Sequence, residues 1–362
     1  MLVESPRALL PVDAYRGDQW FDREQQRLFA DRWVLVASVD ELTAPGDFVT
    51  TVAGRSPLVV VRGHDGELRA FHNICRHRGA VLLQGSGAVN STVNCFYHQW
   101  RYQLDGALVV VPQRREQFPT LDLADWGLLP ASVALWQGMV FAHPAPIAPP
   151  LLAALEGIPE NLGSHQPGLL RQVATAQIEA KCNWKLFVEN HIDVYHLWYL
   201  HADTLGDYDH THFQHHFVGS NWVSYEALKP NRQLENAALI KGTAPIRHLA
   251  TADRIGLRAQ LVFPNLMIAT SSEFWATYVA RPVAPDRSVI DLRIRAEPEA
   301  DAEALLEALH SFIVEDIAAC EAIQQATGSP AFAVGPLAQD HERPITTFHS
   351  NLLAAMAAMD AA

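Results

Sequence analysis

The chain has 362 residues, a formal net charge of −13 at pH 7 and 49% hydrophobic residues, a composition that suits a globular protein of two domains. With this acidic balance and no basic stripe, we expect no nucleic-acid partner. No apolar run approaches the roughly 18 residues that a membrane span needs, and the N-terminus lacks a signal-peptide layout. We therefore expect a cytoplasmic protein without a membrane partner.

Residues 15–32 carry apolar side chains among charged ones, which predicts an amphipathic helix within an N-terminal segment, residues 1–35. From residue 36 to about 150, short β-branched runs alternate with Gly, Pro and Asp-Gly turns, which predicts a small all-β domain. In this domain Asp105-Gly106 lies between two alternating runs, so we expect a tight hairpin turn with positive-φ positions there.

The proline-rich stretch at 143–152 marks the edge of a second domain, residues 151–362. Its mixture of alternating runs and helical patterns predicts an α+β fold, with an antiparallel sheet covered by helices. We expect helices near 183–200, 301–326 and 345–360.

Two of the four cysteines stand beside histidines. Cys75-x-His77 and, 17 residues further on, Cys95-x-x-His98 each offer one thiolate and one imidazole. This set fits a structural zinc ion, or a [2Fe–2S] cluster with thiolates on one iron and imidazoles on the other. Both half-sites lie among predicted strands and not on a helix, which favours the cluster. The aromatic residues expected to shield it are Tyr97, Trp100 and Tyr102.

A second metal site is predicted further along the chain. His196 and His201 are five residues apart, about 140° around a straight helix, so both can bind one metal only if the helix ends or distorts after His196. Asp316 falls in the apolar line of a predicted helix, where an acid is rare unless it is paired or bound to metal. Two histidines and one carboxylate form the facial triad of non-haem Fe(II) oxygenases. The apolar line consists of Leu305, Leu309, Phe312, Cys320 and Ile323.

The stretches "CRHRGA" (75–80) and "CFYHQWRYQLDGAL" (95–108) resemble the cluster-binding signature of the Rieske non-haem iron oxygenases, which include ring-hydroxylating dioxygenases and choline monooxygenase. The usual forms are C-x-H-R-G and C-P-Y-H-G-W-x-Y-x-x-D-G, so Phe96 replaces a proline and Gln99 a glycine. "NWKLFVENHIDVYHLWYLH" (183–201) and "EDIAACEAIQ" (315–324) resemble the catalytic-domain signatures of the same family.

The resemblance implies an all-β Rieske domain (36–150) and a catalytic helix-grip, START-like domain (151–362), on which the N-terminal segment packs. Its ligand assignments are Cys75 and Cys95 on one iron of the cluster, His77 and His98 on the other, and a mononuclear Fe(II) held by His196, His201 and Asp316. Asp193 would then bridge His98 of a neighbouring subunit to His196. Supporting roles are expected for Glu189, Asn190 and Glu321.

The resemblance also implies a terminal oxygenase of a homotrimer with electron transfer between subunits. Such an enzyme uses O₂ and electrons from a separate NAD(P)H-dependent reductase, with or without a ferredoxin, to hydroxylate or oxidatively demethylate a small organic substrate. Two alternatives stay open: an electron-transfer protein without catalytic iron, and a zinc-stabilised ligand-binding protein.

The sequence leaves the substrate open among aromatic rings, quaternary ammonium compounds and natural-product scaffolds. The histidine-rich stretch at 207–216 is interpreted as a mobile loop over the mouth of the active site. Candidate pocket residues are Phe187, Leu205, Phe213, Phe217, Asn221, Phe263, Met267 and Phe274.

Overall fold

The structure is a computed structural model that describes residues 6–235, 240 and 243–358. The chain divides into two compact units. Residues 24–153 form the β unit, and residues 1–23 together with 154–362 form the α+β unit. Residues 24–35, expected to belong to an N-terminal segment that packs on the second domain, are thus grouped with the β unit. The second boundary falls close to the proline-rich stretch.

The β unit contains a seven-stranded sheet, in the order β1-β10-β9-β4-β3-β2-β5, and a three-stranded sheet, β6-β7-β8. All its strand pairs are antiparallel. The strands are β1 Val34–Ser38, β2 Asp47–Ala53, β3 Ser56–Arg62, β4 Leu68–His72, β5 Ser86–Ala88, β6 Thr92–Asn94, β7 Arg101–Gln103, β8 Leu108–Val110, β9 Pro130–Trp136 and β10 Met139–His143. The short helix α2, Arg114–Gln117, follows β8.

The predicted hairpin at Asp105-Gly106 joins β7 to β8. Only Gly106 takes positive φ, at 89°, whereas both central residues of the expected tight turn would do so. Asp105 instead caps the turn, because its Oδ1 accepts a hydrogen bond from the Ala107 N–H at 2.9 Å. A side chain at position 106 would also collide with the ring of Phe71.

The α+β unit is built on a second seven-stranded antiparallel sheet, in the order β11-β17-β16-β15-β14-β13-β12. A long hairpin pairs β16 with β17, and β11 pairs with β17 across more than a hundred residues of sequence. Its strands are β11 Arg171–Ala180, β12 Gln214–Val218, β13 Asn221–Ala227, β14 Gly256–Val262, β15 Leu266–Thr270, β16 Trp275–Ala284 and β17 Arg287–Ala296.

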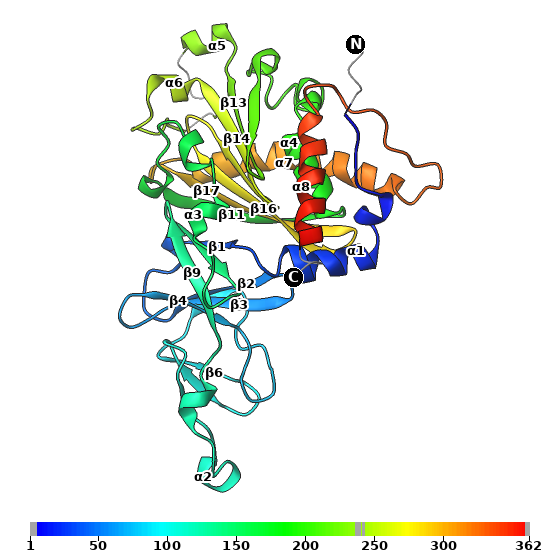
Figure 1. Cartoon of the computed structure of the whole chain (residues 1–362). Helices are drawn as coiled ribbons and strands as arrows, with labels where there is room; N and C mark the ends of the chain where they lie inside the picture. Colours follow the sequence, from blue (N-terminus) through cyan, green and yellow to red (C-terminus); the bar gives the residue numbers. More distant parts are fainter. Residues whose placement is uncertain (1–5, 236–239, 241–242, 359–362) are drawn as a thin grey trace. The chain divides into compact units, whose positions relative to one another are not determined.

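Helices cover this sheet (Figure 1). Helix α4 packs on β14 and β16, α7 packs on β11 and on α4, and α8 packs on α4. The predicted α+β organisation with a large antiparallel sheet is therefore confirmed. The helices are α1 Asp18–Arg23, α3 Leu151–Ala154, α4 Trp184–Ile192, α5 Pro230–Glu235, α6 Thr251–Arg254, α7 Ala302–Ala326 and α8 Arg343–Ala358. The helix expected at 301–326 is confirmed; that at 345–360 is confirmed to 358, and its last two residues lie outside the described part.

Two helix predictions were wrong in detail. The helix expected at 15–32 consists of α1 followed by a π-helical turn, Glu24–Leu28, and ends before residue 32. The helix expected at 183–200 ends at Ile192, and a separate 3-10 turn, Tyr195–Trp198, follows it. Among the described residues, no helix is long and apolar enough to cross a lipid bilayer.

Candidate metal centres

Two loops of the β unit follow the same backbone course around their cysteines. The carbonyl of Cys75 accepts from the Gly79 N–H, and that of Cys95 from the Gln99 N–H, both at 3.0 Å. The residue that closes each turn has positive φ, 76° at Gly79 and 58° at Gln99. Glycine takes this conformation without strain, whereas a residue with a Cβ does not. The departure at Gln99 therefore preserves the loop at a cost in stability.

The four predicted cluster ligands come together at these loops. The thiols of Cys75 and Cys95 are both buried and interact with each other. The rings of His77 and His98 lie 4.6 Å apart, centroid to centroid. Burial raises the pKa of the Cys75 thiol and lowers the pKa of His77. Both shifts favour the uncharged forms of Cys75 and His77.

One buried nitrogen in this group has no hydrogen-bond partner among the described residues. Nδ1 of His77 is buried, and no described residue hydrogen-bonds to it. An imidazole nitrogen with a free lone pair beside two thiols has the donor chemistry of an iron–sulfur ligand. The residues present therefore fit a Cys₂His₂ cluster.

The predicted aromatic residues surround the same point. Trp100 stacks on the ring of His77 with centroids 4.9 Å apart, and the Tyr102 hydroxyl lies 3.4 Å from Cys75 Sγ. The Tyr97 ring leans on His98 but remains half exposed. Phe96, in the place of the usual proline, is 73% exposed and stacks on Tyr97. The substitution at 96 therefore adds apolar surface at the tip of the loop and leaves its interior unchanged.

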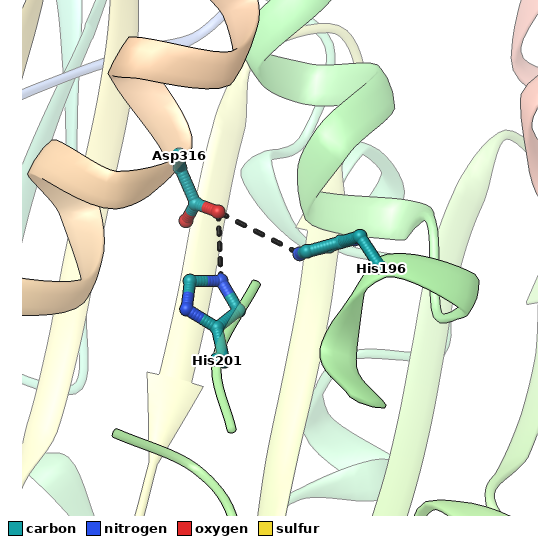
Figure 2. Close-up of side chains that lie close together, drawn as sticks. All are labelled: His196, His201 and Asp316. Carbon is teal, nitrogen blue, oxygen red and sulfur yellow. Dashed lines mark hydrogen bonds and ion pairs between the residues drawn. The ribbon is translucent and has the colours of Figure 1, made fainter. Parts of the chain in front are cut away.

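In the α+β unit, His196, His201 and Asp316 meet, and their ligand atoms all lie within 4.8 Å of one another. Figure 2 shows both imidazoles directed at the same carboxylate oxygen. His201 Nε2 lies 2.8 Å from Asp316 Oδ1, and His196 Nε2 lies 3.6 Å from it. His201 and Asp316 are buried, and His196 is nearly so. Three donors converging from two segments more than a hundred residues apart fit one metal ion.

The electrostatics of the group indicate a place for positive charge. Burial by itself lowers the pKa of His196, but the carboxylates of Asp193 and Asp316 outweigh burial and raise it to about 9. For Asp316, burial raises the pKa, and hydrogen bonds from His196 and His201 outweigh it and keep the pKa below its usual value. In the metal-free chain a proton is therefore held where a metal cation would bind.

The break after α4 brings His196 to this point. Asp193 leaves the helix in an extended conformation, and its Oδ1 accepts from the Tyr195 N–H at 2.6 Å, which starts the 3-10 turn that carries His196. A break was expected after His196; it comes four residues earlier, after Ile192. Asp193 Oδ2 lies 3.2 Å from His196 Nδ1, so the pair meets across the break and not along one helix face.

Sequence reasoning missed a residue that contacts a predicted ligand. Glu315 Oε2 lies 2.8 Å from His201 Nδ1 and also accepts from the Thr204 hydroxyl at 3.0 Å. His201 is thus held at both ring nitrogens by consecutive residues of α7. A carboxylate on the far nitrogen orients a ligand histidine and raises its basicity. Because Glu315 is adjacent to Asp316, helical periodicity places it on another face and gives no indication of this role.

The expected supporting residues have different roles. Glu189 accepts hydrogen bonds from the Tyr15 hydroxyl at 2.8 Å and from His349 Nε2 at 2.9 Å, which ties α4 to the N-terminal segment and to α8. Asn190 lines the cavity described below. Glu321 accepts from the Lys181 N–H and does not contact the triad.

The predicted apolar line of α7 was partly wrong. Leu305, Leu309, Asp316 and Cys320 are buried as predicted, but Ile323 is 46% exposed. Ile313, Ile317 and Gln324 are buried instead, because the buried face drifts around the helix over its 25 residues.

A cavity of about 530 Å³ adjoins the triad, within the range of small-molecule sites. Of the candidate pocket residues, Leu205, Phe213 and Phe274 line it, and five do not: Phe187, Phe217, Asn221, Phe263 and Met267. The stretch at 207–216 is not a loop throughout, since His210–His212 form a 3-10 turn and Gln214–Val218 form β12.

Comparison with known proteins assigns the chain to a family. The model for the ring hydroxylating alpha subunit (catalytic domain) matches residues 168–358, more than half of the chain, and the model for the Rieske [2Fe-2S] domain matches residues 32–127. The chain belongs to the ring-hydroxylating alpha-subunit family. Membership implies a Rieske [2Fe–2S] cluster and a mononuclear iron as the cofactors, and it is consistent with the donor sets in both units.

Relatives within this family act on different compounds. The chain is 34% identical over 206 residues to the glycine betaine monooxygenase oxygenase subunit of Chromohalobacter salexigens, covering 56% of this chain and 46% of that protein. It is 32% identical over 189 residues to the carnitine monooxygenase oxygenase subunit of Acinetobacter baumannii (51% and 50%), and 33% identical over 207 residues to the biphenyl 2,3-dioxygenase subunit alpha of Rhodococcus jostii (54% and 44%). The matches thus span about half the length of these relatives.

Two solved structures share the fold of this ring-hydroxylating alpha subunit along nearly its whole length. A quaternary ammonium Rieske monooxygenase superposes with a TM-score of 0.82 at 23% identity, covering 97% of this chain and 96% of the other. Naphthalene 1,2-dioxygenase from Rhodococcus sp. superposes with a TM-score of 0.77 at 21% identity, covering 96% and 94%.

The conformation of Gln99 generates a stability prediction. Gln99→Gly should raise the free energy of unfolding of the β unit by about 0.5–1 kcal/mol, because glycine adopts positive φ without strain. Gln103→Gly, at an exposed position of β7 with ordinary φ, should lower it by a similar amount. Urea denaturation followed by circular dichroism measures both. Equal destabilisation by the two variants would contradict strain at Gln99.

The contact between Glu315 and His201 generates a second prediction. Glu315→Ala should weaken binding of a divalent metal at the triad by about 10- to 100-fold, since the histidine loses the acceptor that orients it. Anaerobic equilibrium dialysis against Fe(II) measures this change. Glu303→Ala, in the exposed first turn of the same helix, is the matched control and should leave the affinity unchanged. Equal Fe(II) affinities of the two variants would show that Glu315 does not support metal binding.

Proposed function

We propose that this chain is the terminal oxygenase component of a Rieske system. It takes electrons from a separate NAD(P)H-dependent reductase, with or without a ferredoxin, and uses O₂ to hydroxylate, dioxygenate or oxidatively demethylate a small organic substrate. The observation that carries the proposal is the convergence of His196, His201 and Asp316 beside a cavity in a chain that belongs to the ring-hydroxylating alpha-subunit family. We also propose that the protein works in the cytoplasm.

In this proposal each donor set holds one group. Cys75 and Cys95 bind one iron of the cluster, and His77 and His98 bind the other. His196, His201 and Asp316 hold the mononuclear iron. When bound, the cluster supplies electrons and the mononuclear iron supplies a site for O₂ activation. The contribution of the chain is to orient the imidazoles, through Glu315 for His201 and through Asp193 for His196.

We further propose a homotrimer in which Asp193 bridges two copies. A head-to-tail interface that closes on itself brings one copy's β unit to the next copy's α+β unit. In that arrangement the Asp193 carboxylate accepts from His98 of a neighbouring copy while it remains next to His196. The support for this role is its contact with His196 Nδ1 and its position at the break of α4, at the edge of the cavity.

Metal analysis of the purified chain tests the function. We expect a red-brown protein with a Rieske electron paramagnetic resonance signal and about three irons per chain. His201→Ala should reduce this to about two while the Rieske signal remains. About two irons in the wild-type chain would indicate an electron-transfer protein instead, and a colourless zinc protein would reject both functions.

Replacing Asp193 separates binding from turnover. Asp193→Ala should leave cluster and mononuclear iron contents unchanged, yet nearly abolish substrate-dependent consumption of NADH and O₂. Asp193→Asn, which retains a hydrogen-bonding side chain, should recover part of the activity. Iron analysis together with O₂ uptake measures both effects. Normal turnover in Asp193→Ala would overturn the bridging role.

A further inference from the structure

The cavity is lined by carboxylates beyond those at the triad. Six carboxylates line the cavity, of which two, Asp193 and Asp316, belong to the metal site. The other four are Asp207, Glu226, Glu273 and Glu307. Of the residues that the structure describes, no lysine or arginine lines the cavity, so its fixed charge beyond the triad is negative.

Two of these four carboxylates are buried, Glu226 on β13 and Glu273. Glu273 accepts a hydrogen bond from the Ser271 hydroxyl at 2.8 Å, and we take Glu226 as the candidate to receive a ligand. It is only 3% exposed, so its charge has little access to bulk water. Asp207, by comparison, is half exposed and already paired with Arg232 at 3.0 Å, and Glu307 is exposed. Burial raises the pKa of Glu226, and its contact with His210 offsets this effect only in part. A cation bound beside Glu226 would supply the missing compensation.

His210 fixes the position of the Glu226 carboxylate. Its Nδ1 contacts Glu226 Oε1, while its Nε2 is buried and has no partner among the described residues. The carboxylate of Glu226 is therefore held in place at one of its oxygens, Oε1.

Aromatic side chains also line the cavity. Trp222 stacks on Phe213 with centroids 6.1 Å apart, and both rings line the cavity together with Tyr208 and Phe274. Trp222 is 1% exposed, and its indole N–H has no partner among the described residues. Tyr208 also interacts electrostatically with Glu226. Aromatic faces and a buried carboxylate in one cavity can attract a cation through both the ring quadrupole and the charge. The same faces bind a flat apolar body.

We propose that this cavity takes a substrate with a nitrogen cation on an aromatic or other bulky apolar body and without a carboxylate, and that Glu226 recognises the cation. This inference rests on the proposed oxygenase function. The missing carboxylate follows from the charges of the described lining, because an anionic group there would meet carboxylates and no lysine or arginine of the described residues. The bulky body follows from the volume, since about 530 Å³ corresponds to roughly eighteen water molecules.

Three probes with the same number of non-hydrogen atoms separate the features. Benzyltrimethylammonium carries the cation and the ring, neopentylbenzene is its neutral isostere, and carnitine carries the cation with a carboxylate. Equilibrium dialysis against the full chain should show benzyltrimethylammonium binding at least about tenfold more tightly than either of the other two. Equal binding of neopentylbenzene, or tighter binding of carnitine, would overturn the proposal.

A variant tests the residue itself. Glu226→Gln keeps an oxygen acceptor for His210 and removes the charge, so it should reduce the preference for benzyltrimethylammonium over neopentylbenzene by about tenfold and leave neopentylbenzene binding unchanged. Glu160→Gln, an exposed position outside the cavity, is the control for net charge and should change neither affinity. A preference that survives in Glu226→Gln rejects Glu226 as the recognition residue.

The outcome is independent of turnover. Equilibrium binding requires no electrons, so a chain that lacks mononuclear iron and still prefers the cation would reject the oxygenase and support the recognition. A chain with about three irons and no preference for the cation would support the oxygenase and reject the recognition of a cation by Glu226.

Discussion

Burying the carboxylate of Asp316 costs free energy that only cations or hydrogen-bond donors can offset, and the α+β unit is arranged to provide them. The acid lies on the inner face of α7, where its neighbours are otherwise apolar. His201 and His196 reach it from a segment that has to leave its helix to do so. An ion bound by all three would satisfy the carboxylate and both imidazoles at once, so the same residues account for the local stability and for the chemistry.

The geometry of the triad depends on how α4 is held and where it ends. Its start is fixed by Asn183, whose side chain accepts from the Lys185 N–H at 3.0 Å. Near its end, Glu189 is tied to Tyr15 and His349, which belong to segments at opposite ends of the chain. The helix stops three residues later, at Ile192, and the chain turns to present His196. Residues remote in sequence thus help to set the position of His196 without contacting it.

The sequence predicted the two-unit organisation, the large antiparallel sheet and the long helix α7, because alternation and helical spacing are local patterns. It also brought forward His196, His201 and Asp316, since an acid within an apolar stripe is visible in one dimension. The early end of α4 was not predictable, because Asp193 can act as a helix residue or as a cap, and tertiary contacts decide between them. Glu315 and Glu226 were missed for a related reason: each becomes significant only through a histidine that the fold brings beside it.

Two successive residues of α7 contact the two ring nitrogens of His201. Glu315 contacts Nδ1 and Asp316 contacts Nε2. Turning the ring over would break both bonds together, so the imidazole has one orientation even without an ion. An ion held by His196, His201 and Asp316 would take Nε2 of His201, and Glu315 would continue to hold Nδ1. The imidazole would then be oriented before the ion arrives, so that binding would need only small shifts of side chains.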